Sequence, residues 1–199
     1  MKPALVVLAA GASSRLGRAK ALMPLDGQPA FVALLRRAAY FDHAPALVVS
    51  GPHDAEIRAA APPDVEVLAN PDWAAGRTGG LALAHGARPG RDLVIAPVDC
   101  PRVPAAAFAR LGRAWGRLGA PARGWLAPRY AGALPAGRSP FGHPVIAGRE
   151  LLDELAGFAP DRALRELRAL ADPLASEDVP WVEVLDDLDR PEDWEELSG

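Results

Sequence analysis

The sequence is poor in several features that define protein classes. Its one cysteine, Cys100, excludes an intramolecular disulfide framework and any CxxC metal or redox motif, so a reducing, cytoplasmic environment is expected. Its 22 basic and 25 acidic residues give a net charge of −3 without a basic block, which argues against nucleic acid as a partner. The apolar run that ends at Ala10 is well short of the roughly 20 residues that a membrane span needs. We therefore expect no membrane partner and interpret this run as a buried strand.

Short apolar runs alternate with segments of helical length along the chain. The runs predicted as strands are residues 4–8, 46–49, 65–68, 93–96, 124–127, 145–147 and 181–185. The segments predicted as helices are residues 29–40, 54–61, 78–87, 104–118, 149–155 and 161–170, with Pro29 and Pro104 in first turns and Thr78 and Asp161 as N-caps. Continuous apolar runs suit strands that are covered on both faces. The pattern predicts a single α/β domain over residues 1–199, with a mostly parallel sheet and helices on both faces.

The segment from Leu8 to Lys20 follows the first predicted strand and is rich in small residues. Loops at the carboxyl ends of parallel strands form the ligand crevice, where small residues let backbone N–H groups approach phosphate oxygens. Arg15 and Lys20 would supply positive charge, and Lys20 is the only lysine besides Lys2. The segment matches neither GxxxxGK[ST] nor GxGxxG, which disfavours P-loop NTPases and Rossmann dehydrogenases. The alternative interpretation is a flexible turn with solvated basic residues.

Asp99 stands just beyond the predicted strand at residues 93–96. A carboxylate beside a triphosphate is the usual way for a protein to hold Mg²⁺, which takes only one or two protein ligands. The alternative role for Asp99 is to cap the helix that is predicted to begin near Pro104. Its neighbour Cys100 lacks any sequence sign of a nearby base, so we expect an inert thiol.

The residues from Leu8 to Gly27 read Leu-Ala-Ala-Gly-x-Ser-x-Arg-Leu-Gly-x-x-Lys-x-Leu-x-Pro-Leu-x-Gly. This segment resembles the opening signature of the molybdenum-cofactor nucleotidyltransferases, the cytidylyl- and guanylyltransferases related to sugar-phosphate nucleotidyltransferases. The resemblance implies a three-layer, Rossmann-like domain whose first loop cradles a nucleoside triphosphate. The loop residues implied to bind the nucleotide are Leu8, Ala9, Ala10, Gly11, Arg15 and Lys20. Arg15, Lys20 and Asp99 are implied to be catalytic, and Asp99, in an Asp-x-Pro motif, is implied to bind the metal.

Two further segments carry the resemblance. Residues 70–80 are similar to an Asn-x-x-Trp-x-x-Gly segment that approaches base and ribose, which implies nucleotide binding by Asn70 and Gly79; the alternative is a loop and helix start without a ligand. Residues 142–145, Gly-His-Pro-Val, resemble a motif on the acceptor side, which implies acceptor binding by His143; the alternative is a structural histidine. The first loop and Gly-His-Pro-Val favour CTP, whereas Gly79-Gly80-Leu81 is closer to the guanylyl type, so GTP stays open. The other histidines, at positions 43, 53 and 85, are interpreted as surface residues.

The closing segment, residues 187–194, resembles an Asp-x-Asp-Thr-Pro-x-Asp motif with Arg190 in place of threonine. Asp187 and Asp189 would support the metal, or else belong to an ordinary helix start, where the helix dipole favours negative charge. The segment at residues 128–142, rich in Pro, Gly and Arg, is interpreted as a loop near a ligand mouth or a small insertion.

The function implied by the resemblance is transfer of a nucleotidyl group from CTP or GTP, with Mg²⁺ as cofactor, to the terminal phosphate of a molybdopterin-type cofactor. Pyrophosphate would be released, and a molybdoenzyme or chaperone would be the protein partner. Two alternatives stay open: a sugar phosphate or other phosphorylated metabolite as acceptor, and a non-catalytic nucleotide-binding module.

Overall fold

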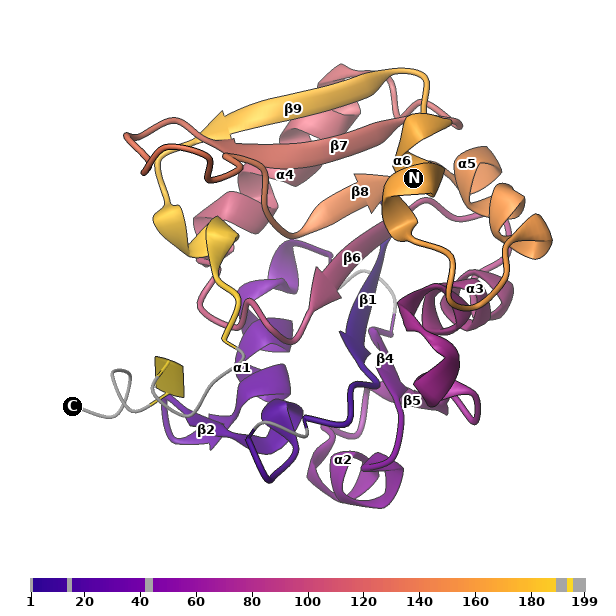
Figure 1. The fold of residues 1–199 in the computed structure, drawn as a ribbon, viewed down its shortest axis with the longest axis vertical. Helices are drawn as coiled ribbons and strands as arrows, with labels where there is room; N and C mark the ends of the chain where they lie inside the picture. The colour runs from indigo at the N-terminus through magenta and orange to yellow at the C-terminus, as the bar shows by residue number, and fades with distance from the viewer. Residues whose placement is uncertain (1, 14–15, 42–44, 189–192, 195–199) are drawn as a thin grey trace.

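The computed structural model describes residues 2–13, 16–41, 45–188 and 193–194 and is built on a seven-stranded sheet (Figure 1). The strand order is β5-β4-β1-β6-β8-β7-β9. The strands are β1 (Ala4–Ala9), β4 (Leu47–Ser50), β5 (Glu66–Ala69), β6 (Leu93–Pro97), β7 (Trp125–Tyr130), β8 (Val145–Ala147) and β9 (Leu174–Val179). Only the pairings of β8 with β6 and with β7 are antiparallel among the described pairs of this sheet. A separate small hairpin joins β2 (Pro24–Leu25) to β3 (Gln28–Pro29).

Helices cover both faces of the sheet. One face is covered by α1 (Ala30–Arg37), α2 (Asp54–Ala60) and α4 (Ala105–Arg117), and the other by α3 (Arg77–Ala87), α5 (Arg149–Asp153) and α6 (Leu164–Ala169). Strand β1 alternates between the two cores, with Leu5 and Val7 on one side and Ala4 and Val6 on the other. Short 3₁₀ helices connect these elements: η1 (Lys20–Leu22), η2 (Ala39–Phe41), η3 (Trp73–Ala75), η4 (Glu154–Gly157) and η5 (Val182–Leu185). The predicted three-layer, mostly parallel α/β fold is confirmed.

The prediction of a strand at residues 181–185 is wrong, because this segment contains the 3₁₀ helix η5. The seventh strand is β9 instead, with the sequence Leu-Ala-Ser-Glu-Asp-Val. It lies at the edge of the sheet next to β7 and buries little beyond alternate residues, so it carries no continuous apolar run.

The predicted helix starts also need correction. Helix α3 begins at Arg77, and its N-cap is Gly76. Thr78 lies inside the helix, and its hydroxyl donates a hydrogen bond to the carbonyl of Arg162. Helix α6 begins only at Leu164, three residues beyond Asp161, and its N-cap is Ala163. Pro29 and Pro104 precede the first turns of α1 and α4 as N-caps.

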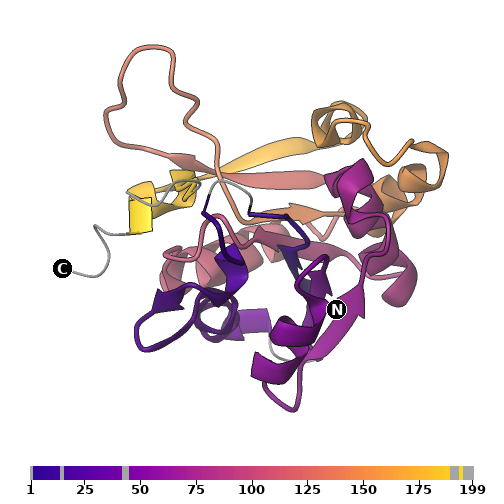
Figure 2. The ribbon, with the colours of Figure 1, turned by 60° about the horizontal axis from the view of Figure 1, so that its bottom comes forward.

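The carboxyl ends of β1, β4, β5 and β6 face the same end of the molecule because these strands are parallel. The long loop between β7 and β8 extends away from the body of the protein near this end (Figure 2). Strand β7 itself continues to Tyr130, so the loop begins at residue 131, three residues later than the predicted start at residue 128. Among the helices in the described part of the chain, none is long and apolar enough to cross a membrane.

Candidate active site

A cavity of about 300 Å³ lies at the carboxyl ends of β1, β4, β5 and β6. Most of the residues that the sequence assigns to nucleotide binding line it together: Leu8, Ala9, Ala10, Gly11, Lys20, Asn70 and Asp99. Arg15, which was assigned to the same site, lies outside the described residues. Gly79 is not among the lining residues; its neighbour Gly80 is, whereas a side chain at Gly79 would meet Pro160.

Lys20 and Asp99, which both line this cavity, form an ion pair. The Lys20 Nζ atom lies 2.7 Å from Asp99 Oδ1, and the two side chains are 8% and 16% exposed. The backbone N–H of Lys20 also donates a hydrogen bond to Ser13 Oγ at 2.9 Å, which fixes the end of the first loop. On the other side, a guanidinium nitrogen of Arg77 lies 3.4 Å from Asp99 Oδ2. Asp99 therefore faces cations with both of its oxygens and does not cap α4, whose N-cap is Pro104.

Asn70 is a buried polar residue at the wall of the cavity, 3% exposed. Its Oδ1 accepts a hydrogen bond from the backbone N–H of Asp72 at 3.1 Å, which orients the amide. Its Nδ2 has no hydrogen-bond partner in the described structure. A buried donor without a partner costs free energy, so this amide is suited to rearrangement toward a ligand acceptor.

Ser13, Trp73, Arg77 and Gly80 also line this cavity; they lie in the two segments that were expected at the site, but sequence reasoning did not single them out as binding residues. His53 was missed altogether. His53 was interpreted as a surface residue; its side chain is 26% exposed and lines the cavity in the segment after β4. Its place between a predicted strand at residues 46–49 and a predicted helix at residues 54–61 was the available signal, since the loops at the carboxyl ends of parallel strands converge.

A second cavity, of about 390 Å³, adjoins the first and shares Arg77, Pro97 and Asp99 with it. Its other walls come from Cys100 after β6, from the loop before β8 and from the segment around η5. These residues are Cys100, Arg138, Ser139, Phe141, Gly142, His143, Val184, Leu185, Asp186 and Asp187. The structure thus brings His143 and Asp187 to the side of Asp99 that faces away from the first loop, while Asp189 lies outside the described residues.

The backbone at Gly142 and His143 packs directly against Val184. The N–H of His143 donates a hydrogen bond to the carbonyl of Val184 at 2.8 Å, and a Cβ atom at Gly142 would lie 1.9 Å from the same oxygen. Burial is the main cause that lowers the pKa of His143; the Asp99 carboxylate opposes the shift and the positive charge of Arg77 adds to it, and the resulting pKa is about 4. The imidazole is therefore neutral at pH 7 and offers one acceptor and one donor nitrogen.

This lowered pKa predicts a loss of stability in mild acid. Between about pH 6.5 and pH 4 the unfolded chain binds a proton at His143 that the folded protein does not, so the free energy of unfolding falls as the pH falls. In urea unfolding at about pH 7 and pH 5, we expect His143→Gln to lose about 1–2 kcal/mol less than the parent protein. Equal losses in both proteins would contradict the assignment.

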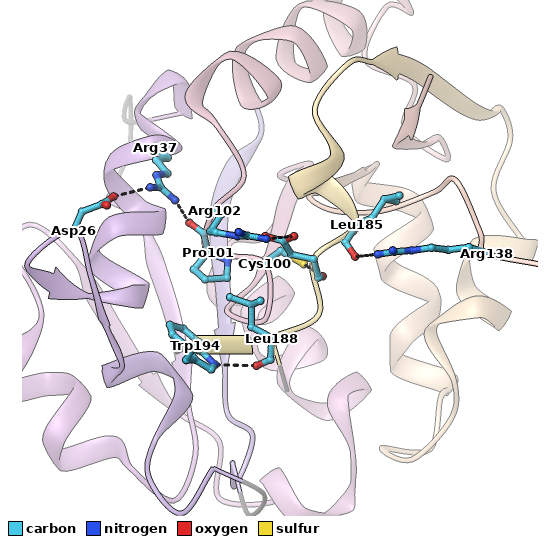
Figure 3. A network of polar contacts seen from close by, with 10 residues as sticks. Asp26, Arg37, Cys100, Pro101, Arg102, Arg138, Leu185, Leu188 and Trp194 are labelled. Carbon is cyan, nitrogen blue, oxygen red and sulfur yellow. Dashed lines mark hydrogen bonds and ion pairs between the residues drawn. The ribbon is translucent and has the colours of Figure 1, made fainter. Parts of the chain in front are cut away.

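The loop that carries Asp99 is fastened to the segment after β9 (Figure 3). Arg102 donates two hydrogen bonds to the Asp186 carboxylate, at 2.8 and 2.9 Å, and the Leu188 N–H donates to the Asp99 carbonyl at 3.1 Å. The Cys100 thiol donates to the Asp186 carbonyl at 2.9 Å, and burial raises its pKa, so the thiol stays protonated as expected of an inert side chain. These contacts fix the backbone of Asp99 and give Asp186 a structural role.

The acidic residues of the site do not form a complete metal cage. Among residues that the structure describes, no group of three or more His, Cys, Asp or Glu side chains could hold a metal ion. Asp99 is one carboxylate at the junction of the two cavities, and Asp187 lines the second of them. A divalent cation held here would need oxygens from a ligand to complete its shell, which is how Mg²⁺ commonly binds beside phosphates.

Comparisons with known proteins show the enzyme class and the family to which this chain belongs. The structure is similar to a nucleotidyl transferase from Methanothermobacter, Mth528, with 25% identity over 98% of this chain and 95% of that one and a TM-score of 0.72. A family model of the MobA-like NTP transferase domain matches residues 5–179. The chain therefore belongs to the MobA-like NTP transferase family and is a nucleotidyltransferase by class. Comparison with curated protein sequences finds no match.

Other solved structures extend this result. Rv0371c from Mycobacterium tuberculosis H37Rv is 28% identical over 99% of this chain and 97% of that one, with a TM-score of 0.78. The same mycobacterial protein is also known in complex with manganese, at 26% identity, 99% and 98% coverage and a TM-score of 0.74. The molybdopterin-guanine dinucleotide biosynthesis protein A from Archaeoglobus fulgidus, at 17% identity, 97% and 95% coverage and a TM-score of 0.69, shares the fold.

Proposed function

We propose that this protein transfers a nucleotidyl group from CTP to the terminal phosphate of a molybdopterin-type cofactor and releases pyrophosphate. The observation that carries the proposal is the ion pair between Lys20 and Asp99, which stands where two adjoining cavities meet. The first cavity would hold the nucleoside triphosphate and the second the acceptor. In this arrangement the α-phosphorus would lie close to Asp99, between the two substrates.

The proposed reaction asks for positioning and charge neutralisation more than for covalent participation by the protein. An oxygen of the acceptor phosphate forms a bond to the α-phosphorus, and the bond from that phosphorus to the bridging oxygen breaks. The electron pair of that bond leaves with pyrophosphate. No general base is needed, because the attacking phosphate is already ionised at neutral pH. Lys20, buried against Asp99, would offset charge on the triphosphate in a setting of low dielectric, where such an interaction is strong.

Asp99 is the residue that would hold a divalent cation, and Asp187 is a further carboxylate of the second cavity, where the Asp186 carboxylate already pairs with Arg102. The residues fit such an ion: Asp99 offers oxygen donors that the cations Lys20 and Arg77 now face, and a triphosphate would compete for those cations. A bound cation would supply Lewis-acid neutralisation of the phosphate oxygens. Mg²⁺ is the proposed ion, supported by the oxygen-only donor set and by the manganese complex of the mycobacterial neighbour.

Nucleotide binding is the first part of the test. We would measure the thermal unfolding midpoint with CTP, GTP, UTP and ATP, each with Mg²⁺, because a ligand that binds only the folded state raises the midpoint. Selective stabilisation by CTP supports the proposal, whereas selective stabilisation by GTP would show that GTP, and not CTP, is the nucleotide substrate.

Acceptor use is the second part. Pyrophosphate release would be followed with molybdopterin, with sugar phosphates and with other phosphorylated metabolites as acceptors. Release with molybdopterin alone supports the proposal, and release only with a sugar phosphate or another metabolite assigns the acceptor to that class. Nucleotide binding without release from any acceptor would identify a non-catalytic nucleotide-binding module.

A further inference from the structure

Arg77 lies at the junction of the two cavities, beside Asp99. Among the described lining residues, Lys20 belongs to the first cavity and Arg138 to the second, whereas Arg77 lines both. Its side chain is 75% exposed, and its contact with Asp99 Oδ2, at 3.4 Å, is longer than the contact that Lys20 makes. The guanidinium is therefore placed beside Asp99 but is held there only weakly.

The backbone that carries Arg77 is fixed more firmly than its side chain. Gly76 has a φ angle of 142°, which side-chain-bearing residues rarely adopt, and a Cβ atom there would lie 2.4 Å from the carbonyl oxygen of Pro160. One residue beyond Arg77, the Thr78 hydroxyl donates to the carbonyl of Arg162. The start of α3 thus packs closely against the segment before α6. The long, exposed side chain of Arg77 therefore extends from a backbone whose position is fixed.

The proposed reaction must bring two anionic groups into contact at this junction. The acceptor phosphate and the α-phosphate repel each other, and the carboxylates of Asp99 and Asp187 add negative charge to the same region. A guanidinium is planar, keeps its charge and carries five N–H donors, so it can bind two oxygens of the acceptor phosphate at once. Lys20 lines only the first cavity and presents a single point charge.

We propose that Arg77 is a catalytic residue that binds the acceptor phosphate and holds it against the α-phosphate of the nucleotide. This inference rests on the proposed function, and it gives the second cavity a defined ligand chemistry: a phosphate monoester that enters with its phosphate toward Arg77. Substrate binding would exchange the weak contact of Arg77 with Asp99 for contacts with phosphate oxygens, and would leave the Asp99 oxygen Oδ2 without this cation.

The test uses inorganic phosphate as the probe of the acceptor site. The first cavity is saturated with Mg²⁺ and the α,β-methylene analogue of whichever nucleotide stabilises the protein, and phosphate binding is then followed by ³¹P NMR. We expect Arg77→Ala to weaken phosphate binding by about 10-fold or more and Arg77→Lys to recover part of it. Binding of the nucleotide analogue should change much less. Arg113→Ala, which alters an exposed arginine of α4, is the matched control and should behave like the parent protein.

Three results would overturn the inference. These are phosphate binding by Arg77→Ala that equals that of the parent protein, equal weakening of phosphate and nucleotide analogue, and no saturable phosphate binding by the parent protein. The titration requires no turnover, so it stays readable if no acceptor yields pyrophosphate, a result that counts against the proposed function alone. Where an acceptor is found, Arg77→Ala should also raise the acceptor KM and lower kcat, with the nucleotide KM nearly unchanged.

Discussion

Replacing Lys20 with alanine is expected to lower turnover by about 100-fold or more while the protein stays folded. The Lys20 amine lies 2.7 Å from Asp99 and is almost fully buried at the wall of the first cavity. A charge in such a place interacts strongly with phosphate oxygens because little water screens it. Steady-state pyrophosphate release measures the effect, and circular dichroism melting checks the fold.

The chain offers a matched control in its other lysine. Lys2 is exposed, donates a hydrogen bond to the Tyr40 carbonyl at 3.1 Å and lies over the Tyr40 ring, far from both cavity linings in the fold. Lys2→Ala should keep the turnover of the parent protein. Near-normal turnover in Lys20→Ala would remove Lys20 from the mechanism.

Asp99→Asn is expected to lower turnover by a similar factor, about 100-fold or more, for a different reason. The amide keeps the shape of the carboxylate but loses its charge, so binding of a divalent cation should weaken along with catalysis. Titration with Mn²⁺ in the presence of the nucleotide analogue, followed by electron paramagnetic resonance, measures that binding directly. Stability should fall as well, by about 1–3 kcal/mol, because the Lys20 amine would keep its burial without the carboxylate.

A double-mutant cycle separates these effects. In the Lys20→Ala background, Asp99→Asn should cost less stability than it does alone, because the buried charge is already gone. The control is Asp153→Asn, which alters an exposed carboxylate of α5 that pairs with His85. Unchanged turnover and Mn²⁺ binding in Asp99→Asn would show that this carboxylate holds no metal.

The sequence was most informative where a structural signal is local. Continuous apolar runs predicted the central strands β1, β4 and β6, since a strand covered on both faces must be apolar along its length. The same criterion failed for β9, an edge strand whose apolar residues are interrupted by Ser176, Glu177 and Asp178. It also mistook the apolar residues of η5 for a strand. The first loop, Lys20 and Asp99 were predicted to share one site, and the structure places them in one cavity.

What escaped prediction depends on contacts between distant segments. Arg77 is one of 20 arginines that the composition of the chain makes individually uninformative, and only its fixed place at the start of α3 sets it between the two cavities. The structural role of Asp186 likewise becomes visible only in the fold, where its carboxylate pairs with Arg102, 84 residues away in the sequence, and holds the loop that contains Asp99. Such pairings follow from the topology of the chain and have no local pattern.

The antiparallel strand β8 divides the sheet into two parts, with β5, β4, β1 and β6 on one side and β7 and β9 on the other. The described lining of the first cavity comes from residues 8–99, whereas most of the second comes from residues 100–187. If the first cavity holds the triphosphate, as proposed, the loop before β8 can be replaced by a longer or shorter one without disturbing the residues that bind the triphosphate. A chimaera in which residues 131–141 are replaced by the corresponding loop of a relative that uses another acceptor should show the acceptor preference of that relative and the nucleotide preference of the present protein.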